Sequence, residues 1–544
     1  MERISCFSKQ FQHVRPFQSK FACFTPSSRH HFTDLYRFLV FHLNPFWIHL
    51  CYFISISFVG FLVLNVLDPK NSSKRPKNLD MFFTSVSATT VSSMGTVELE
   101  VFSNTQLVIL TLLMLIGGEV FTSILGLGLQ LMKNKFKKQD KIENRVGSVT
   151  AELSSKDPTA VDELIEMGIE KRPVLKHSEL GDVGSEIQEF PSEELKYRCI
   201  NYLGFVVLVY LVLVHVIGSS LIFLYLILIS SARDVLKKKG IQMQTFAIFT
   251  TVSSFSNCGF LPTNENMIVF KENSGLLLLV IPQILLGNTL YPPFLRLVIW
   301  VLKKFSGRVE FDHMLKNPNL IGYDHLLPSL HCVFLSLTVF GFLVVQLVMF
   351  CYMEWNSEAL VGMNSYQKIV GGLFESVNSR HSGESIVDLS TLPAAILVVY
   401  VVMMYLPPYT AYLPIEDDTR SLENRQNGHK RRGLLKNLIL SPPSYLAIFI
   451  ILICITEREK LSQDPLNFNV LNITVEVVSA YGNVGFTTGY SCQRQLKPDS
   501  NCKDAWYGFA GRWSNKGKII LIVVMLFGRV KKFNMKGGKA WKLS

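Results

Sequence analysis

Eight long apolar runs alternate with polar segments along the chain. Most of the runs reach or exceed the roughly 20 residues that a helix needs to cross the hydrocarbon core of a bilayer, and the last run is the shortest. They cover approximately residues 46–67, 103–132, 199–230, 275–301, 326–352, 389–413, 438–456 and 517–530. This pattern predicts an all-α membrane protein with eight spans, because apolar runs of this length are typical of transmembrane helices.

A shorter and less apolar stretch lies between the two members of each successive pair of spans. These stretches are rich in Ser, Thr or Asn, and each ends near a glycine. They cover about residues 80–95, 243–259, 366–383 and 472–485. The arrangement predicts four copies of one unit, in which a helix, a re-entrant pore loop and a second helix follow one another.

The ends of the four stretches resemble one another. They read Ser93-Met94-Gly95, Asn257-Cys258-Gly259, His381-Ser382-Gly383 and Asn483-Val484-Gly485. One such glycine would mean little, because glycine is frequent in transmembrane helices. Four of them at the same place relative to the flanking spans indicate a repeat.

Loops of this kind suit a pathway for cations. Irregular backbone at membrane depth is tolerated only where it lines a water-filled cavity or is buried in protein. A permeating cation exchanges its hydration water for oxygen ligands, which rings of backbone carbonyls supply. Glycine allows the backbone to turn these carbonyls inward and adds no side chain to block the axis. The four repeats are therefore predicted to surround a single central pore, with the twelve residues just given as its cation filter.

The same pattern divides the chain into segments. The pore repeats are expected at 43–132, 199–301, 326–413 and 437–530. The rest is expected in the cytosol, as a tail at 1–42, a charged linker at 133–198, loops at 302–325 and 414–436, and a tail at 531–544.

Basic residues set the expected orientation. Lys and Arg near the ends of spans collect on the cytosolic side of membrane proteins, and most of the basic clusters fall on one side, which places both termini in the cytosol. The clusters at 70–77 and 237–239 fall on the other side and temper this assignment without reversing it. The glycosylation motifs at Asn71 and Asn472 are then exterior, and Asn71 is farther from the pore.

Composition narrows the classes of function. The residues are 49% hydrophobic and 18% charged, with a net charge of +12. In a soluble protein this charge would suggest nucleic acid, but here basic cytosolic segments account for it, so we expect no nucleic-acid partner. No motif for a cofactor, a metal or a catalytic site is found, and the expected metal ions are the permeating ones alone. Cys492 and Cys502 are expected in a polar exterior loop. The sequence leaves open whether they form a disulfide or remain two free thiols.

Two other classes of membrane protein fit less well. An embedded enzyme would need paired acids, a cluster of His and Cys, or a nucleophile with its base inside the spans. A rocking secondary transporter would show broken helices in inverted repeats. The repeat here consists of four parallel copies of one unit, which favours a pore over both alternatives.

Longer motifs around the loops resemble those of plant HKT transporters, which belong to the Trk/Ktr/HKT superfamily. The motifs are SVSATTVSSMGTVE at 85–98, FSNCGFLPTNEN at 255–266, NSRHSGE at 378–384 and YGNVGFTTGY at 481–490. The resemblance implies four membrane–pore–membrane units around one pathway, a location among the lipids of the plasma membrane, and Na⁺ and K⁺ as the transported ions. It leaves a homodimer open.

The first loop bears on the choice of ion. In the resembled family its filter position is Ser in mostly Na⁺-selective members and Gly in many members that also carry K⁺. Gly95 stands at this position, whereas the other loop sequences look like the Na⁺-type branch. We therefore expect Na⁺ transport with K⁺ permeability, in the service of sodium and potassium homeostasis and salt tolerance. The alternative is a member that carries mainly K⁺ or cotransports Na⁺ and K⁺.

The resemblance also implies a gate beneath the filter. Arg529, at the end of the last span, is expected to brace it, although an interfacial Arg that snorkels is the alternative. Related proteins gate with an irregular segment of the sixth span, where Pro407 and Pro408 lie, although the two prolines could simply kink the helix.

Several acidic residues follow the loops directly. Glu98, Glu265 and Glu384 are expected on the outer face, where acids concentrate cations near a pore mouth. Ordinary solvated charges are the alternative. Glu119 lies inside the second predicted span, where a charge is costly and usually functional or paired.

Overall fold

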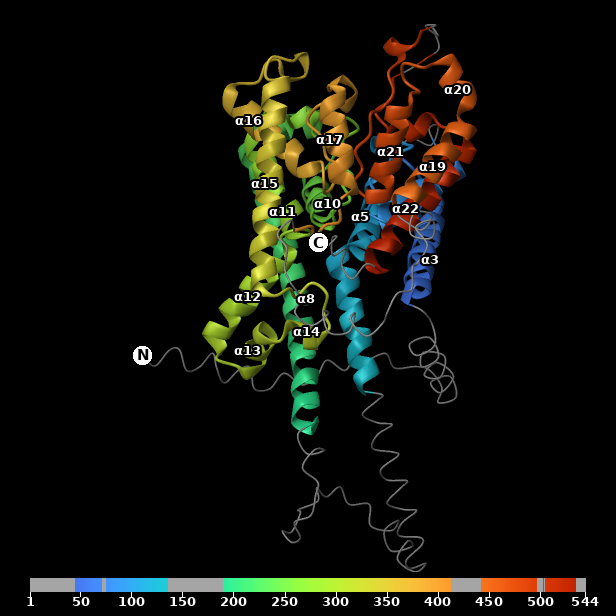
Figure 1. Cartoon of the computed structure of the whole chain (residues 1–544). Helices are drawn as coiled ribbons and strands as arrows, with labels where there is room; N and C mark the ends of the chain where they lie inside the picture. The colour runs from blue at the N-terminus through green and yellow to red at the C-terminus, as the bar shows by residue number, and fades with distance from the viewer. Residues whose placement is uncertain are drawn as a thin grey trace, which may run out of the picture. The chain divides into compact units, whose positions relative to one another are not determined.

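The computed structural model describes residues 45–70, 75–135, 189–411, 442–496, 502 and 504–534 (Figure 1). Over these residues the chain is helical and contains no strand. The expected N-terminal tail, most of the linker at 133–198, the loop at 414–436 and most of the C-terminal tail lie outside the described residues.

Helices occupy the regions of all eight predicted spans. They are α3 (Pro45–Val66), α5 (Asn104–Gly117) with a second helix at Glu119–Lys135, α8 (Glu189–Leu228), α11 (Ser274–Leu286) with α12 (Tyr291–Ser306), α15 (Ser329–Glu354), α17 (Ala394–Tyr405), α19 (Pro442–Thr456) and α22 (Asn515–Asn534). Among the described residues, three helices are long and apolar enough to cross a membrane, or five if each bent pair forms one span.

Three predicted spans are not continuous helices, and the sequence-based expectation is wrong there. The span predicted at 103–132 bends by 54° at Gly118, whose backbone is extended. The span predicted at 275–301 bends by 82° before two prolines that begin α12. The span predicted at 389–413 is helical only over α17, which ends just before Pro407 and Pro408, because proline cannot donate the backbone hydrogen bond that continues a helix.

Four short helices match the less apolar stretches. They are α4 (Asn78–Thr89), α10 (Met243–Ser256), α16 (Ser365–Asn378) and α21 (Val470–Gly482). Their many hydroxyl groups are buried because several bond to carbonyls one turn back, as Thr89 does to Ser85 at 2.8 Å and Ser376 to Gly372 at 2.7 Å. Such internal bonds let polar residues pack inside the protein.

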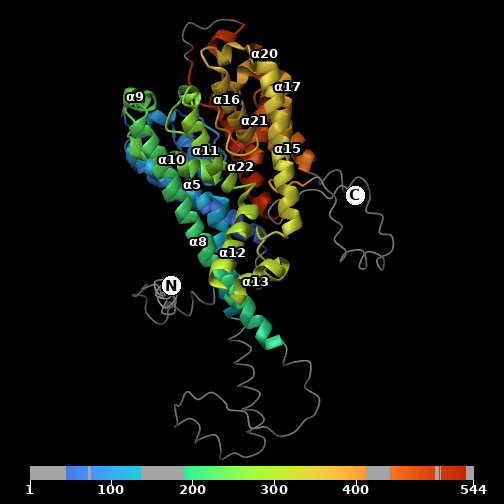
Figure 2. The ribbon, with the colours of Figure 1, turned by 90° about the vertical axis from the view of Figure 1, so that its left-hand side faces the viewer.

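The span helix that follows each short helix packs against the short helix of the next repeat. α5 packs against α10, α11 against α16, α17 against α21, and α22 against α4. The last of these contacts joins the end of the described chain to its beginning. In Figures 1 and 2, α10, α16 and α21 all lie above α12 and α13 (Val309–Lys316). The helices therefore close a circle in chain order.

One close backbone contact recurs in this circle. Gly117, Gly287 and Gly528 each lie so close to the end of a short helix that a Cβ atom would stand about 2 Å from a carbonyl oxygen. The three oxygens and their distances are those of Thr89 at 1.9 Å, Phe255 at 1.8 Å and Tyr481 at 2.0 Å. Only glycine permits this approach. The corresponding end of α17 carries no glycine and is followed by Pro407 and Pro408 instead.

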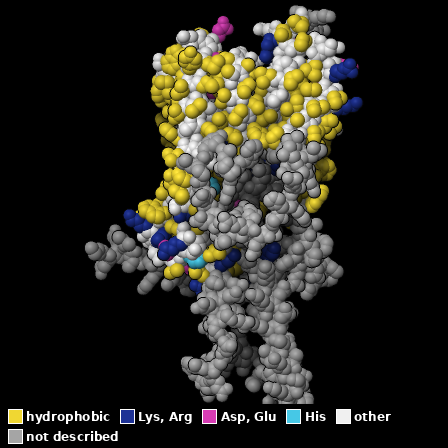
Figure 3. Space-filling view, viewed as in Figure 1, with side chains coloured by type: hydrophobic (Ala, Val, Ile, Leu, Met, Phe, Trp, Pro, Cys, Tyr) yellow, Lys and Arg dark blue, Asp and Glu magenta, His cyan; other side chains and the backbone are white. Residues whose placement is uncertain are grey.

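The outward faces of the helices are apolar. Val59 on α3, Val212 on α8 and Val345 on α15 are each more than half exposed. On the face seen in Figure 3, hydrophobic side chains cover most of the upper part, and Lys and Arg lie at its upper edge and again lower, near α12 and α13. Large exposed apolar surfaces of this kind suit contact with lipid rather than water, which fits a multi-pass membrane protein.

Four further helices complete the described chain. They are α9 (Ser230–Lys239), α13 (Val309–Lys316), α14 (Pro318–Ile321) and α20 (Arg458–Gln463). α9 precedes the short helix α10 and ends with three lysines before Gly240, which adopts the left-handed conformation.

Candidate functional site

Each short helix gives way to a non-helical segment that contains a predicted filter glycine. Asn257 and Asn483 end α10 and α21 in the left-handed conformation, with φ of 58° and 50°. Gly259, Gly383 and Gly485 follow with φ of 87°, 68° and 104°. L-residues with a side chain rarely adopt such angles, so the second, third and fourth loops need glycine there.

The four loops touch one another in chain order. A Cβ at Gly259 would lie 1.5 Å from the carbonyl oxygen of Ser382, and one at Gly383 would lie 2.5 Å from that of Val484. A Cβ at Gly485 would lie 2.2 Å from the Cβ of Ser93, and the Glu100 amide, after the first loop, donates to the Asn264 side-chain oxygen, after the second, at 3.0 Å. The second loop thus meets the third, the third the fourth, and the fourth and second both meet the first. The predicted filter residues are brought together in one closed ring.

Gly95 differs from the other three glycines. Its φ is not positive, and a Cβ there would approach only Gly508 N at 3.7 Å and Val97 O at 4.0 Å. The left-handed residues of the first loop are Val91 and Ser93 instead, each with φ of 50°. The first loop is therefore the one place in the ring where a side chain fits without displacing backbone.

The other predicted filter residues anchor the loops through their side chains. Met94, Cys258, His381, Ser382 and Val484 are all at most 2% exposed. The His381 ring lies 2.9 Å from the hydroxyl of Thr289, and the hydroxyl of Ser382 donates to the Asn378 side chain at 2.8 Å.

Two asparagines hold the loops against the helices behind them. The amide of Asn257 donates to the Ile284 carbonyl at 3.2 Å, and that of Asn483 donates to the Met525 carbonyl at 3.2 Å. Asn483 also donates to the Ser92 hydroxyl at 2.7 Å, which ties the fourth loop to the first. Since the same contact occurs in two loops, it is part of the repeat.

Sequence reasoning missed two buried glutamates of the short helices. Glu375 accepts bonds from the Ser385 hydroxyl at 2.7 Å and from the Ile386 amide at 2.7 Å. Glu476 accepts a bond from the Ala510 amide at 3.0 Å. Each carboxylate holds the segment that leads away from the ring. A charged residue in the middle of a short helix at membrane depth was the signal that could have found them.

Arg529 is buried, with 2% of its surface exposed, which argues against an interfacial residue that snorkels. Its guanidinium donates to the Gly117 carbonyl at 2.5 Å, at the bend that follows α5, and lies 5.8 Å from the centre of the Phe53 ring. The Glu119 carboxylate attracts it. Arg529 therefore joins α22 to the first group of helices.

Pro407 and Pro408 are held by a residue of the third loop. The Arg380 guanidinium donates to the carbonyls of both prolines, to that of Pro408 at 3.2 Å. The hydroxyl of Thr410 also donates to the Pro407 carbonyl, at 2.7 Å. The irregular segment after α17 is therefore fixed to the ring by side chains.

Glu119 has partners that the sequence did not reveal. Its carboxylate accepts a bond from the Tyr409 hydroxyl at 3.5 Å and lies 3.9 Å from the His325 ring, which contacts the same hydroxyl at 2.7 Å. The carboxylate is thus hydrogen-bonded, and the nearby Arg529 supplies the opposite charge that its position inside a span calls for.

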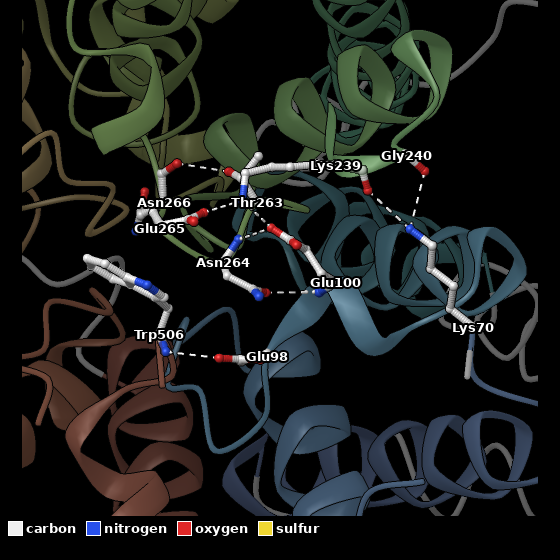
Figure 4. A network of polar contacts seen from close by, with 10 residues as sticks. All are labelled: Lys70, Glu98, Glu100, Lys239, Gly240, Thr263, Asn264, Glu265, Asn266 and Trp506. Atoms are coloured by element: carbon white, nitrogen blue, oxygen red, sulfur yellow. Dashed lines mark hydrogen bonds and ion pairs between the residues drawn. The ribbon is translucent and has the colours of Figure 1, made fainter. Parts of the chain in front are cut away.

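The three predicted mouth acids occupy different environments. Glu98 accepts a bond from the Trp506 amide at 3.1 Å, and Glu265 pairs with Lys239, both in the network of Figure 4. Glu384 is fully buried and accepts a 2.5 Å bond from the Ser254 hydroxyl. The alternative reading of Glu384 as an ordinary solvated charge is wrong, because its carboxylate is buried against the second repeat, and its role at the pore mouth stays a prediction.

The sites predicted to lie in exterior loops also differ from one another. Asn71 lies outside the described residues. Asn472 lies in α21, is 7% exposed and donates to the Asn467 carbonyl at 2.8 Å, which argues against a glycan on this amide. Cys492 and Cys502 are joined by a disulfide.

Comparisons with known proteins bear on this arrangement. The family model TrkH, described as a cation transport protein, matches residues 185–411 and 434–535. Cation transporter HKT1;3 of Oryza sativa subsp. japonica is 50% identical, covering 98% of this chain and 98% of its own length. Sodium transporter HKT1 of Arabidopsis thaliana is 50% identical, covering 88% of this chain and 91% of its own length.

A solved structure is a more distant neighbour. The potassium transporter TrkH from Vibrio parahaemolyticus is 13% identical with a TM-score of 0.47, and the match covers 91% of this chain and 85% of that one. The family match spans more than half of the chain, and the two plant relatives are half identical to it over most of its length. The chain therefore belongs to the TrkH family of cation transport proteins, as an HKT-type transporter.

Proposed function

We propose that Na⁺, and K⁺ with it, crosses the membrane through the ring formed by the four loops. Four membrane–pore–membrane units then surround a single central pore. As an HKT-type transporter the chain moves monovalent cations, and the observation that supports this route is the contact of each loop with the next. No enzymatic step is involved.

The chemistry of the ring fits this route. Gly259, Gly383 and Gly485 have no room for a Cβ, and neighbouring side chains are engaged in the packing behind them. The groups left to meet a cation are backbone carbonyls, which replace its hydration shell in selective pores. A ring of neutral oxygens binds a monovalent cation weakly enough for the ion to leave again.

Gly95 is the position at which ion selectivity is set in this proposal. Because a Cβ there meets only ordinary contacts, a serine would fit and would add a side chain to one quarter of the ring alone. Its absence leaves the ring uniform, which supports Na⁺ transport with K⁺ permeability.

Currents in oocytes test this assignment. Two-electrode recordings would compare wild type with Gly95→Ser in Na⁺ and K⁺ baths. We expect the wild-type reversal potential to respond to both ions, and Gly95→Ser to lower relative K⁺ permeability roughly tenfold, or about 1.4 kcal/mol. A K⁺ current unchanged by the substitution would refute the proposal that Gly95 sets the ion selectivity. A wild-type reversal potential that follows K⁺ alone would instead favour the mainly K⁺-carrying alternative.

The same oocytes also allow a test of the location and orientation of the protein. We propose a plasma-membrane protein with both termini in the cytosol, on the side of α12 and α13, whose lysines and arginines fit the positive-inside rule. The disulfide then lies on the oxidising exterior. A terminal epitope that is labelled in intact oocytes would contradict this orientation. A homodimer remains an expectation from the resemblance.

A further inference from the structure

Lys239 reaches two loops at once on the outer side of the ring. It is the last residue of α9, and its ammonium nitrogen lies 2.6 Å from Oε1 of Glu100 and in closer contact with Glu265. Glu100 follows Gly95 in the first loop, and Glu265 follows Gly259 in the second. Figure 4 shows the two carboxylates converging on the lysine from the two segments that lead away from the ring.

Hydrogen bonds from backbone amides to side-chain oxygens hold the same two segments together. The Glu100 amide donates to the Asn264 side-chain oxygen at 3.0 Å, and the Asn264 amide donates to Oε1 of Glu100 at 3.0 Å. The carbonyl of Lys239 in turn accepts a bond from the Lys70 ammonium at 3.1 Å. The lysine thus sits at the junction of two loops that are 164 residues apart in sequence.

The surroundings make this more than an ordinary surface ion pair. Exposed pairs contribute little, because water and salt screen them. Here the Lys239 side chain is 16% exposed, and those of Glu100 and Glu265 are 24% and 25% exposed. Partial burial by itself lowers the pKa of Lys239, but the bonds and charges of Glu100 and Glu265 outweigh it and raise the pKa above its usual value, so the ammonium is charged at neutral pH.

We propose that Lys239 is a positioning residue for cation permeation. Its ammonium joins the outer segments of the first and second loops, and its charge offsets one of the two carboxylates that face the incoming cation. The three side chains together carry one net negative charge, which sets the external Na⁺ concentration for half-maximal current. The inference rests on the proposed route through the ring.

The test uses the full-length transporter in oocytes, with currents measured over a range of external Na⁺ at constant ionic strength. Lys239→Met leaves two unopposed carboxylates, and we expect the half-saturating Na⁺ concentration to fall roughly threefold, the effect of one unit charge at about 6 Å in water. The shift should be larger at about 0.01 M than at 0.1 M ionic strength, since the Debye length shortens from about 30 to 10 Å. Lys238→Met, one residue earlier and exposed, is the matched control for charge.

Variants of Glu265 separate the effect of charge on Na⁺ affinity from the effect of the link between the two loops. Glu265→Gln should raise the half-saturating concentration roughly threefold, the opposite sign for the same unit charge, and it tests the charge effect even if Lys239→Met fails to reach the membrane. The double variant Lys239→Met/Glu265→Gln should return this value to that of wild type, because the net charge is restored. The Na⁺/K⁺ permeability ratio of the double variant should still differ from that of wild type, because the link between the two loops is missing.

The possible results are distinct. A wild type without Na⁺ current would refute the proposed function itself. The role of Lys239 would be overturned if the wild type conducted Na⁺ normally, Lys239→Met had the same half-saturating Na⁺ concentration as Lys238→Met, and Glu265→Gln had that of wild type. A double variant with the wild-type permeability ratio would overturn its positioning part.

Discussion

The glycines of the four loops differ in the space around their α-carbons. We expect Gly259→Ala to reduce Na⁺ current more than about tenfold, because a φ of 87° alone costs a side chain about 1–3 kcal/mol and the Cβ would strike the Ser382 carbonyl. Gly95→Ala should conduct, since its Cβ meets only ordinary contacts. Currents normalised to the surface amount of protein measure both. Equal losses in the two variants would contradict the distinction.

The repeat in the sequence singled out four loop glycines, and the structure brings their loops into contact, while their role as a cation filter stays a prediction. Four glycines after four similar stretches were enough to place the ring. The sequence could not show that Gly95 alone has room for a side chain, because that depends on φ and on Gly508, far along the chain. It also gave Glu384 the same reading as Glu265, although one carboxylate is buried and the other is paired at the surface.

At the scale of elements, apolarity predicted where helices lie and not where they break. Each of the spans with bends of 54° and 82° is apolar enough as a whole to count as one span, so mean hydropathy does not reveal the bends. The breaks occur where Gly117 and Gly287 press on the carbonyl ends of short helices. Each helix thus bends at a contact with the short helix of its own repeat, which a hydropathy window does not include, although the glycines and the two prolines of α12 mark the places.

Arg529 links two such elements, and its removal should show in the current. We expect Arg529→Gln to raise Na⁺ current by up to about fivefold, because it removes a buried positive charge near the path; unit charges about 4 Å apart interact by about 1 kcal/mol even in water. It also weakens the bond to Gly117 at the bend after α5. Arg529→Lys keeps the charge and should remain near wild type. An Arg529→Gln current at or below that of wild type, at equal surface amounts, would argue against this role.

At the scale of the whole molecule, the pattern of spans predicted the number and order of the units but not the contact that closes them. That contact lies between residues at opposite ends of the chain. Lys518 of α22 donates to Asp80 of α4 at 2.7 Å across 438 residues, and the two side chains are 9% and 13% exposed. Neither residue belongs to a repeated motif, so no pattern within one unit could have paired them.

This closing pair predicts a result that is not additive. Removing one partner of a buried ion pair costs about 3–5 kcal/mol because the other charge is left unpaired, whereas replacing both is often nearly neutral. We therefore expect Lys518→Met and Asp80→Asn each to lower the unfolding temperature of the purified transporter, and Lys518→Met/Asp80→Asn to recover most of the loss. Lys516→Met, exposed on the same helix, controls for the lost charge. If the double variant were as unstable as the two losses added together, the ring would be closed by packing of α22 against α3 and α4 and not by this pair.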